Sequence, residues 1–365
     1  MVLQKMRFEL TECSSLYAKD LVEIEGDISG RKIYFGKVDE QLPEIANPEY
    51  NFRSCRLLAW ALENLGGKLE SFLAKYGKNR VAIVLGASNT GVDEAQAHIE
   101  SSLRHREEDP DRFPADFRFS MLELGSPSSY LADATGVTGP AYTISTACSS
   151  SAKAFPAARR LIEAGICDAA IVGGVDGRCR FAMNGFHALG ALSQGRCRPL
   201  AEDRDGICLG EGVALFLMER EDASRARQGQ VFFAGAGESS DAYHATAPEP
   251  EGYGAEAAML AAISDARCSA DSIDYVNLHG TGTQANDSME MKAVRRVFGE
   301  DLRAGDASRP LTVESTKSVT GHCLGAAGAV EAAICWEKIR SGVVHRSISN
   351  SFAFGGSNAS VILEG

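Results

Sequence analysis

One thiol stands among small residues where a predicted strand is followed by a predicted helix. The stretch 144–165 reads ISTACSSSAKAFPAARRLIEAG, and its cysteine is Cys148. At a helix N-terminus the free backbone N–H groups and the helix dipole favour an anion, so we expect a lowered thiol pKa. The small neighbours leave room for a substrate carbonyl, whose oxyanion the same N–H groups could stabilise. Cys148 is therefore a candidate nucleophile, with a buried structural cysteine as the alternative.

Two histidines and a lysine form the rest of the candidate site. His279 follows an apolar run and precedes Gly-Thr-Gly-Thr, while Lys317 lies five positions before His322 in ESTKSVTGHCLGAAG. One cysteine, two histidines and a lysine favour covalent acyl chemistry: a thiolate nucleophile, two donors for an enolate and a fixed positive charge. A metal site is the weaker interpretation, because no ligand spacing such as HxxxH or CxxC supports it. We expect neither a metal nor a cofactor.

The elements that must position these residues alternate between strands and helices. In the first half, strands are predicted at 80–89, 141–146, 168–176 and 213–220, and helices at 120–136 and 148–164. In the second half, strands are predicted at 230–239, 274–283, 311–316, 346–352 and 358–365, and helices at 255–266 and 325–342. The reactive residues each follow a predicted strand, at the edge where ligands bind open α/β sheets.

Both halves repeat one pattern, in which a β-branched strand turns through Ser, Thr and Gly into an Ala-rich helix. The pattern predicts a pseudo-duplicated α/β protein. We place the N-terminal half, with the cysteine, at 1–228 and the C-terminal half, with the two histidines and the lysine, at 229–365. No low-complexity linker separates them, which favours one compact unit.

The composition narrows the class of protein. The chain has 365 residues, 44% of them hydrophobic, and a formal net charge of −12, which argues against nucleic acid as the main partner. No apolar run is long enough to span a membrane, and the start lacks the apolar core of a signal peptide. The ten cysteines show no disulfide-framework spacing. Reduced thiols in a cytoplasmic protein are expected.

Four motifs resemble one family, in the right order. STACSSS, NLHGTGTQANDSME, STKSVTGHCLGAAGAVEA and NSFAFGGSNAS are similar to segments of the β-ketoacyl-[acyl-carrier-protein] synthases, members of the thiolase-like superfamily. RPLAEDRDGICLGEGVALFLMER resembles the segment between the active-site halves, and the likeness runs from Arg53 to the last residue. The resemblance implies a layered α-β-α-β-α architecture. Within the family, the motifs look most like the synthases of aryl-polyene type gene clusters.

The resemblance also implies a mechanism. Cys148 would accept an acyl chain from an acyl carrier protein as a thioester, with the backbone N–H groups of Cys148 and Phe354 as the oxyanion hole. His279 and His322 would bind the thioester carbonyl of malonyl-carrier protein and stabilise the enolate left by loss of CO₂. Attack of that carbanion on the acyl group would lengthen the chain by two carbons.

The family also suggests supporting roles. Lys317 would keep the site positive and orient His322, with Glu331 as its charge partner, and Phe354 resembles the aromatic gate of the acyl pocket. Thiolases use a second catalytic cysteine, but GHCLGAAG is the synthase pattern, so Cys323 is expected to be packing. Two further acids of the motif, Asp287 and Glu290, are assigned to structure.

The expected partners are acyl and malonyl carrier proteins and a second subunit. Arg53 and Arg56, one helical turn apart, match docking positions of the family, although a solvated helix face is an even alternative. Family members are dimers; a homodimer is expected here, with a heterodimer as the alternative. A non-catalytic partner subunit that sets chain length is the rival function. Such subunits usually lose the nucleophile.

Two departures from the family are expected. We expect no counterpart of the glycine-rich first strand of the family, because MRFELTECSSLYAKDL is a poor match to it. The segment between EKIRSGVV and SISNSF is shorter than in relatives. Either departure could be natural or reflect an incomplete chain.

Overall fold

A ten-stranded sheet organises the chain. The computed structural model describes residues 6–25, 32–104, 116–221, 229–299 and 311–365. The strands of the large sheet are β1 (Phe8–Tyr17), β4 (Val81–Gly86), β5 (Ala141–Ile144), β6 (Ala169–Asp176), β8 (Gly212–Arg220), β9 (Phe232–Ser240), β10 (Tyr275–Asn277), β11 (Thr312–Glu314), β12 (Arg346–Phe352) and β13 (Ser357–Glu364). A small second sheet contains β2 (Val22–Glu25), β3 (Lys32–Gly36) and β7 (Leu209–Gly210).

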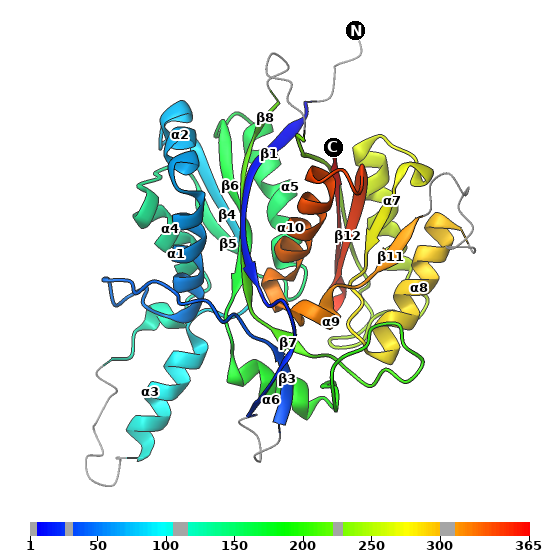
Figure 1. Ribbon diagram of the computed structural model, residues 1–365, viewed down its shortest axis with the longest axis horizontal. Coiled ribbons are helices and arrows are strands. Elements are labelled where there is room, and N and C mark those ends of the chain that lie inside the picture. The colour runs from blue at the N-terminus through cyan, green and yellow to red at the C-terminus, as the bar shows by residue number, and fades with distance from the viewer. Residues whose placement is uncertain (1–5, 26–31, 105–115, 222–228, 300–310) are drawn as a thin grey trace.

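The strand order is duplicated. Across the large sheet it runs β11-β10-β12-β13-β9-β1-β8-β6-β4-β5. Figure 1 labels β1, β8, β6, β4 and β5 of the first half and β11 and β12 of the second. Counted from either edge, each half has its third strand first, then its second, fourth, fifth and first. The halves meet at β1 and β9, which pair over only two residues of each strand. This repeated topology is the thiolase-like arrangement expected from the sequence.

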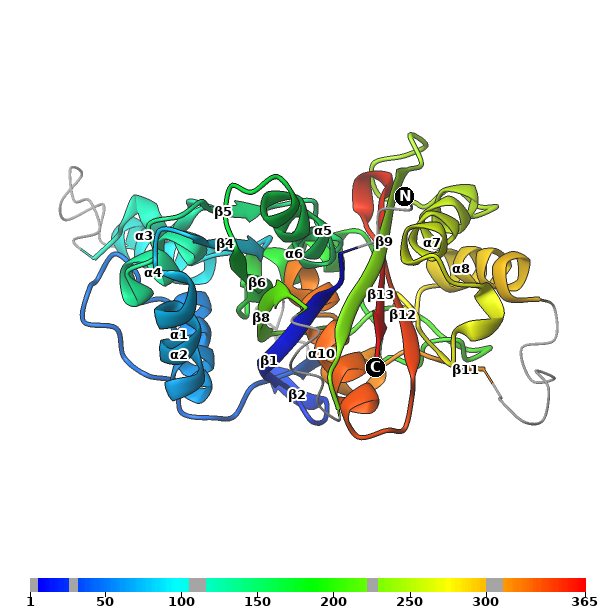
Figure 2. The same cartoon turned by 90° about the horizontal axis from the view of Figure 1, so that it is seen from above.

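Helices separate and cover the two halves of the sheet. They are α1 (Arg53–Leu65), α2 (Gly67–Tyr76), α3 (Val92–Arg104), α4 (Ser126–Thr135), α5 (Ser150–Glu163), α6 (Arg180–Ala188), α7 (Tyr253–Ala266), α8 (Gln284–Phe298), α9 (Lys317–Thr320) and α10 (Ala327–Arg340). Helices α5 and α10 pack against each other and against strands of both halves, whereas α1 and α4 lie on one outer face and α7 on the other (Figure 2). The result is the predicted five-layer architecture.

Small residues let the central helices approach the sheet and each other. A Cβ atom at Gly86 of β4 would lie 2.1 Å from the backbone nitrogen of Ser151. One at Gly328 of α10 would lie 2.7 Å from the backbone nitrogen of Ala152. Larger side chains would push α5 away from both neighbours, so the small residues around Cys148 serve close packing as well as any substrate.

The expectation of a missing first strand is wrong. Residues Phe8–Tyr17 form β1, which pairs with β8 along nearly its whole length and with β9 at its start. The polar residues of β1 do not fit the apolar pattern that predicts a central strand. Glu9, for example, is buried and accepts a hydrogen bond from the Gln230 side chain at 2.9 Å. Backbone pairing with strands some 200 residues away stabilises β1, and no local pattern reports such pairing.

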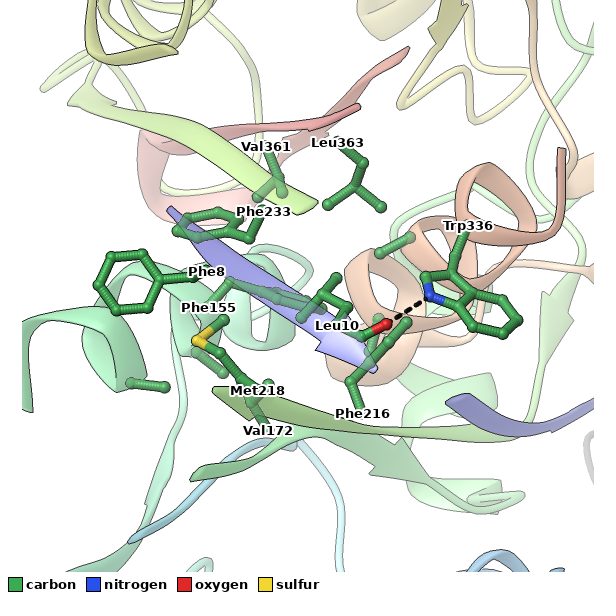
Figure 3. Close-up of a cluster of buried hydrophobic side chains, with 14 of the residues drawn as sticks. Phe8, Leu10, Phe155, Val172, Phe216, Met218, Phe233, Trp336, Val361 and Leu363 are labelled. Carbon is green, nitrogen blue, oxygen red and sulfur yellow. Dashed lines mark hydrogen bonds between the residues drawn. The ribbon is translucent and has the colours of Figure 1, made fainter. Parts of the chain in front are cut away.

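The largest core cluster lies between the two halves, around the start of β1 (Figure 3). Phe155 of α5 packs edge-on to Phe216, with ring centroids 5.2 Å apart, and stacks on Phe233. The Trp336 indole N–H donates to the Leu10 carbonyl at 3.0 Å. These contacts join β1, α5 and α10, and thereby fix the frame of the site. Within the described part of the chain, the helices are all too short or too polar to cross a bilayer.

Candidate active site

Cys148 lies in a tight turn between β5 and α5. The preceding residue, Ala147, has a positive φ of 51°, an unusual backbone state for a residue with a side chain. Ser150 holds the turn together, since its hydroxyl accepts from the Thr146 N–H at 2.9 Å and donates to the Ala147 carbonyl. The helix begins at Ser150, two residues later than predicted. The turn thus presents the sulfur ahead of the helix N-terminus.

The expectation of an acidic thiol at Cys148 is wrong. Burial raises the pKa of Cys148 to about 11. The Lys317 ammonium group and the backbone N–H of Phe354 both oppose that rise. Because desolvation outweighs these two effects, Cys148 is a neutral thiol at neutral pH and needs a base when it reacts.

The two histidines meet the cysteine in three dimensions. One ligand atom from each of Cys148, His279 and His322 lies within 4.8 Å of the other two. The imidazole rings are 5.2 Å apart at an interplanar angle of 83°. The loop of His279 is held by Glu290 of α8, whose carboxylate accepts the N–H groups of His279 at 2.8 Å and Gly280 at 2.7 Å. Glu290 therefore positions the loop, in line with its structural assignment.

The tautomer of His322 follows from its hydrogen bonds. Its Nδ1 accepts the backbone N–H of Leu324 at 3.2 Å, so in the neutral ring Nε2 carries the proton and acts as a donor. The backbone is held as well: the His322 N–H donates to the Cys208 carbonyl at 2.8 Å, and the Gly210 N–H donates to the His322 carbonyl at 3.0 Å. A metal would need a lone pair at Nε2, so this arrangement favours hydrogen-bond donation over metal binding.

Both imidazoles are neutral at physiological pH. Burial lowers the pKa of His279 well below its usual value, and the positive charge of Lys317 lowers it further. The pKa of His322 is lowered by the same burial and by Lys317. A neutral imidazole can donate a hydrogen bond through one ring nitrogen or take up a proton at the other, which makes the ring a cation.

Lys317 and Glu331 form an ion pair behind the histidines. Lys317 Nζ bonds Glu331 Oε1, and the two residues are 1% and 2% exposed. Burial raises the pKa of Glu331 to about 7, although the lysine opposes the rise. Neither residue lines the cavity, so the lysine acts on it through its charge. The predicted charge pair is present; its catalytic role stays a prediction.

The substitution Lys317→Met is expected to destabilise the fold by about 3–5 kcal/mol at pH 8, since it leaves a buried carboxyl group unpaired. Below pH 6 the deficit should shrink, because Glu331 is then protonated. A folded-state pKa above the unfolded value means that stability is lost as pH rises. Urea denaturation at both pH values measures this. The double variant Lys317→Met/Glu331→Leu is the control and should recover part of the loss. A pH-independent deficit would contradict the explanation.

A cavity of about 340 Å³ surrounds the reactive groups. Cys148, His279, His322 and Phe354 all line it. The Phe354 ring is 37% exposed and packs on Phe186 of α6, with centroids 5.5 Å apart. Both rings line the same cavity as the sulfur, and the gating role of Phe354 stays a prediction.

Sequence reasoning missed several residues of the site. The sequence does not predict helix α6, and therefore does not identify Phe186 as a residue of the site. For Asp176, at the end of β6, the sequence predicts only a place in a strand. Its buried carboxylate accepts the Ser88 and Asn89 N–H groups at 3.0 and 2.6 Å and approaches Gly325, three residues after His322. A lone acid ending an apolar strand was the available signal.

The two arginines assigned to carrier docking are engaged within the chain. Arg53, at the start of α1, pairs with Glu211, which is fully buried, and also donates to the Val38 carbonyl at 3.2 Å. Arg56 donates to the Pro43 carbonyl at 2.9 Å and pairs with Glu44. Neither lines the cavity. Their role in docking stays a prediction.

Cys323 has the environment of a packing residue. Its thiol lies 3.4 Å from the Glu211 carbonyl, it is 2% exposed, and it does not line the cavity. Burial, together with the nearby Glu331, raises its pKa. These observations support its assignment to packing over a second catalytic cysteine.

The fold and the site define a class: a duplicated thiolase-like scaffold with a cysteine and two histidines in one cavity. A family model described as "Beta-ketoacyl synthase, N-terminal domain" matches residues 11–224, and one described as "Beta-ketoacyl synthase, C-terminal domain" matches residues 232–351. The chain belongs to the β-ketoacyl synthase family.

Named relatives agree with this membership. The chain is 37% identical over 262 residues to "3-oxoacyl-[acyl-carrier-protein] synthase 2" of Rhizobium meliloti (strain 1021), covering 62% of this chain and 61% of the relative. It is 35% identical over 254 residues to "Nodulation protein E" of Rhizobium meliloti, covering 61% of each. The chain thus spans about three fifths of the length of these curated relatives.

Solved structures match the whole chain. A chain of the complex of a ketosynthase (ApeO) with its chain length factor (ApeC) from Xenorhabdus doucetiae has a TM-score of 0.89 and 35% identity, covering 98% of both chains. "The ishigamide ketosynthase/chain length factor" has a TM-score of 0.84 over 99% of both chains; at 24% identity it supports the fold alone.

Proposed function

We propose that this protein is a β-ketoacyl-[acyl-carrier-protein] synthase that extends a fatty-acyl or polyenoyl chain by two carbons. The supporting observation is the cluster of Cys148, His279 and His322, whose ligand atoms lie within 4.8 Å of one another in a cavity. The ammonium group of Lys317 behind them supplies a fixed positive charge. The reaction is a decarboxylative Claisen condensation.

Acyl transfer comes first. The neutral Cys148 thiol attacks the carrier thioester while a facing imidazole takes its proton and later passes it to the departing carrier thiol. His279 suits this task, because its Nδ1 has no hydrogen-bond partner among the described residues and so does not fix one tautomer. The N–H groups of Cys148 and Phe354 hold the oxyanion.

Condensation follows in the same cavity. The malonyl thioester carbonyl accepts hydrogen bonds from His322 Nε2–H and from His279, so negative charge can build on that oxygen as the carbon–carbon bond to CO₂ breaks. The resulting carbanion attacks the acyl carbon on Cys148 and releases the thiolate as the leaving group. Lys317 stabilises the anionic states by its charge, from behind the rings.

The decisive experiment is exposure of the full chain to an acyl-carrier thioester, followed by peptide mass spectrometry. Acylation confined to the peptide with Cys148 is expected. Failure of Cys148 to acylate, by the free chain or with its partner subunit, would instead favour the chain-length role. That second candidate remains because the matched solved complex pairs a ketosynthase with a chain length factor.

We further propose that a second ketosynthase-type subunit pairs with this chain. The edge strand β5 begins with two exposed residues, Ala141 and Tyr142, and an uncovered strand edge is a ready template for pairing. Native mass spectrometry of the protein from its own cells separates the two forms. One subunit mass indicates a homodimer, and two masses indicate a heterodimer.

Carrier docking is tested at Arg56. Charge reversal at Arg53 would leave the buried carboxylate of Glu211 unpaired, so a loss of docking could not be told from a loss of folding. Arg56→Glu is expected to raise the KM for carrier-bound substrate about fivefold, since carrier proteins of the family are acidic. Arg56→Gln is the matched control and should have a smaller effect. Small thioesters should react at the unaltered rate with both variants. Equal losses on both substrate types would remove Arg56 from the docking surface.

A further inference from the structure

Two buried cysteines touch each other beside the active site. Cys197 lies in the loop after α6, and Cys208 directly precedes β7. The Cys197 N–H donates to the Cys208 sulfur at 3.1 Å, and the Cys208 thiol lies 3.3 Å from the Gly195 carbonyl. Both residues are buried, at 2% and 3% exposed. The acyl chemistry proposed above uses neither thiol.

Each cysteine forms a hydrogen bond with the backbone of an active-site residue. The Cys197 thiol donates to the backbone carbonyl of Lys317 at 3.2 Å. The Cys208 carbonyl accepts the backbone N–H of His322 at 2.8 Å. A change in the covalent state of this pair therefore acts on the chain just before and just after the turn that connects Lys317 to His322.

We propose that Cys197 and Cys208 are a redox modification site, which a hydroperoxide closes to a disulfide that slows the chemistry at His322. The Cys208 sulfur already lies against the backbone of Cys197, so bond formation needs side-chain rotation and a short approach. A disulfide requires sulfurs about 2.05 Å apart, well inside a non-bonded sulfur contact. Closure also removes the thiol that donates to Lys317.

The reaction balances with hydrogen peroxide as the oxidant. The Cys197 sulfur attacks one peroxide oxygen, the O–O bond breaks, and a sulfenic acid and one water form. The Cys208 sulfur then attacks the Cys197 sulfur, the S–O bond breaks, and the hydroxyl group leaves with the Cys208 proton as a second water. Two thiols are oxidised by two electrons, and one peroxide is reduced to two waters.

The environment favours Cys197 as the first to react. The neighbouring Cys208 thiol lowers the pKa of Cys197, and the positive charge of Lys317 lowers it further, whereas the Cys197 thiol raises the pKa of Cys208. Ile207, which directly precedes Cys208, lines the active-site cavity. Cys197 then becomes the sulfenic acid and Cys208 the resolving thiol.

Peptide mass spectrometry of the full-length Cys148→Ala variant tests the site, since that variant lacks the competing nucleophile. After peroxide treatment and alkylation, we expect a cross-linked peptide containing Cys197 and Cys208, about 2 Da lighter than the two free peptides. Cys323 should remain alkylatable as an internal control. Cys148→Ala/Cys208→Ser should give no cross-link. Free thiols at 197 and 208, under a peroxide dose that oxidises Cys148 in the unaltered enzyme, would overturn the proposal.

The effect on the active site is measured by decarboxylation of malonyl-carrier protein, a readout that rests on the proposed function. Oxidised Cys148→Ala should decarboxylate several-fold more slowly than the reduced form, with full recovery in dithiothreitol. Cys148→Ala/Cys208→Ser should be insensitive to peroxide. If the cross-link forms and the rate does not change, coupling to His322 is refuted. If no form decarboxylates, the proposed function fails while the mass measurement still decides the disulfide.

Discussion

Cys148→Ala is expected to abolish condensation, lowering kcat at least about 1,000-fold, since no other thiol of the described residues lines the cavity. The same variant should fold normally, because alanine fits a turn already built from small residues. It should also still decarboxylate malonyl-carrier protein, since both histidines remain. Separate measurements of CO₂ release and of product formation test this division.

The control for Cys148→Ala is Cys268→Ser, at a half-buried cysteine that does not line the cavity. It should retain full activity. Two results would contradict the assignment: substantial condensation by Cys148→Ala, or loss of acylation in Cys268→Ser. Either would place the acyl chain on a different residue.

The two histidines are expected to fail in different ways. His322→Ala should reduce decarboxylation about 100- to 1,000-fold, the usual cost of losing one oxyanion donor, and leave acylation of Cys148 nearly unchanged. His279→Ala should slow both steps, because we assign it the thiol proton as well as one hydrogen bond. Single-turnover acylation and CO₂ release, measured side by side, separate these losses.

A matched control is His322→Asn, which keeps an N–H donor and should recover part of the decarboxylation lost in His322→Ala. The pH profile is a second check. Because the pKa values of His279 and His322 are well below 6.5, neither ring gains a proton between pH 8 and pH 6.5, and decarboxylation should show no histidine titration there. Equal loss of acylation in both alanine variants would contradict the division of roles.

The pH dependence of stability has a defined sign for these histidines. Their folded-state pKa values lie below those of the unfolded chain, so the unfolded state binds more protons once the pH falls below about 6.5. Stability from this source is therefore lost toward acid. The raised pKa of Glu331 acts in the opposite direction, because its contribution to folding stability is lost as the pH rises toward 7.

Local sequence determined the reactive residues and most of the elements around them. The strands 169–176 and 213–220 have the apolar or β-branched runs that strands need, and the short segments around Cys148, His279 and His322 have the residue types that acyl chemistry needs. Such signals depend on a few neighbouring residues, so they can be read without the fold. The repeat of these signals predicted two similar α/β halves, whereas the order of the strands in the sheet came from the structure alone.

Tertiary structure decided what depends on distant partners. The polar strand β1 exists because β8 and β9 pair with it across some 200 residues. The thiol of Cys148 is not acidic, because the surrounding layers desolvate it more strongly than the nearby charge and N–H groups compensate. Arg53 meets a buried carboxylate, and Cys197 meets Cys208, only after loops fold together. Burial and long-range pairing are properties of the folded chain, so no local motif predicts them.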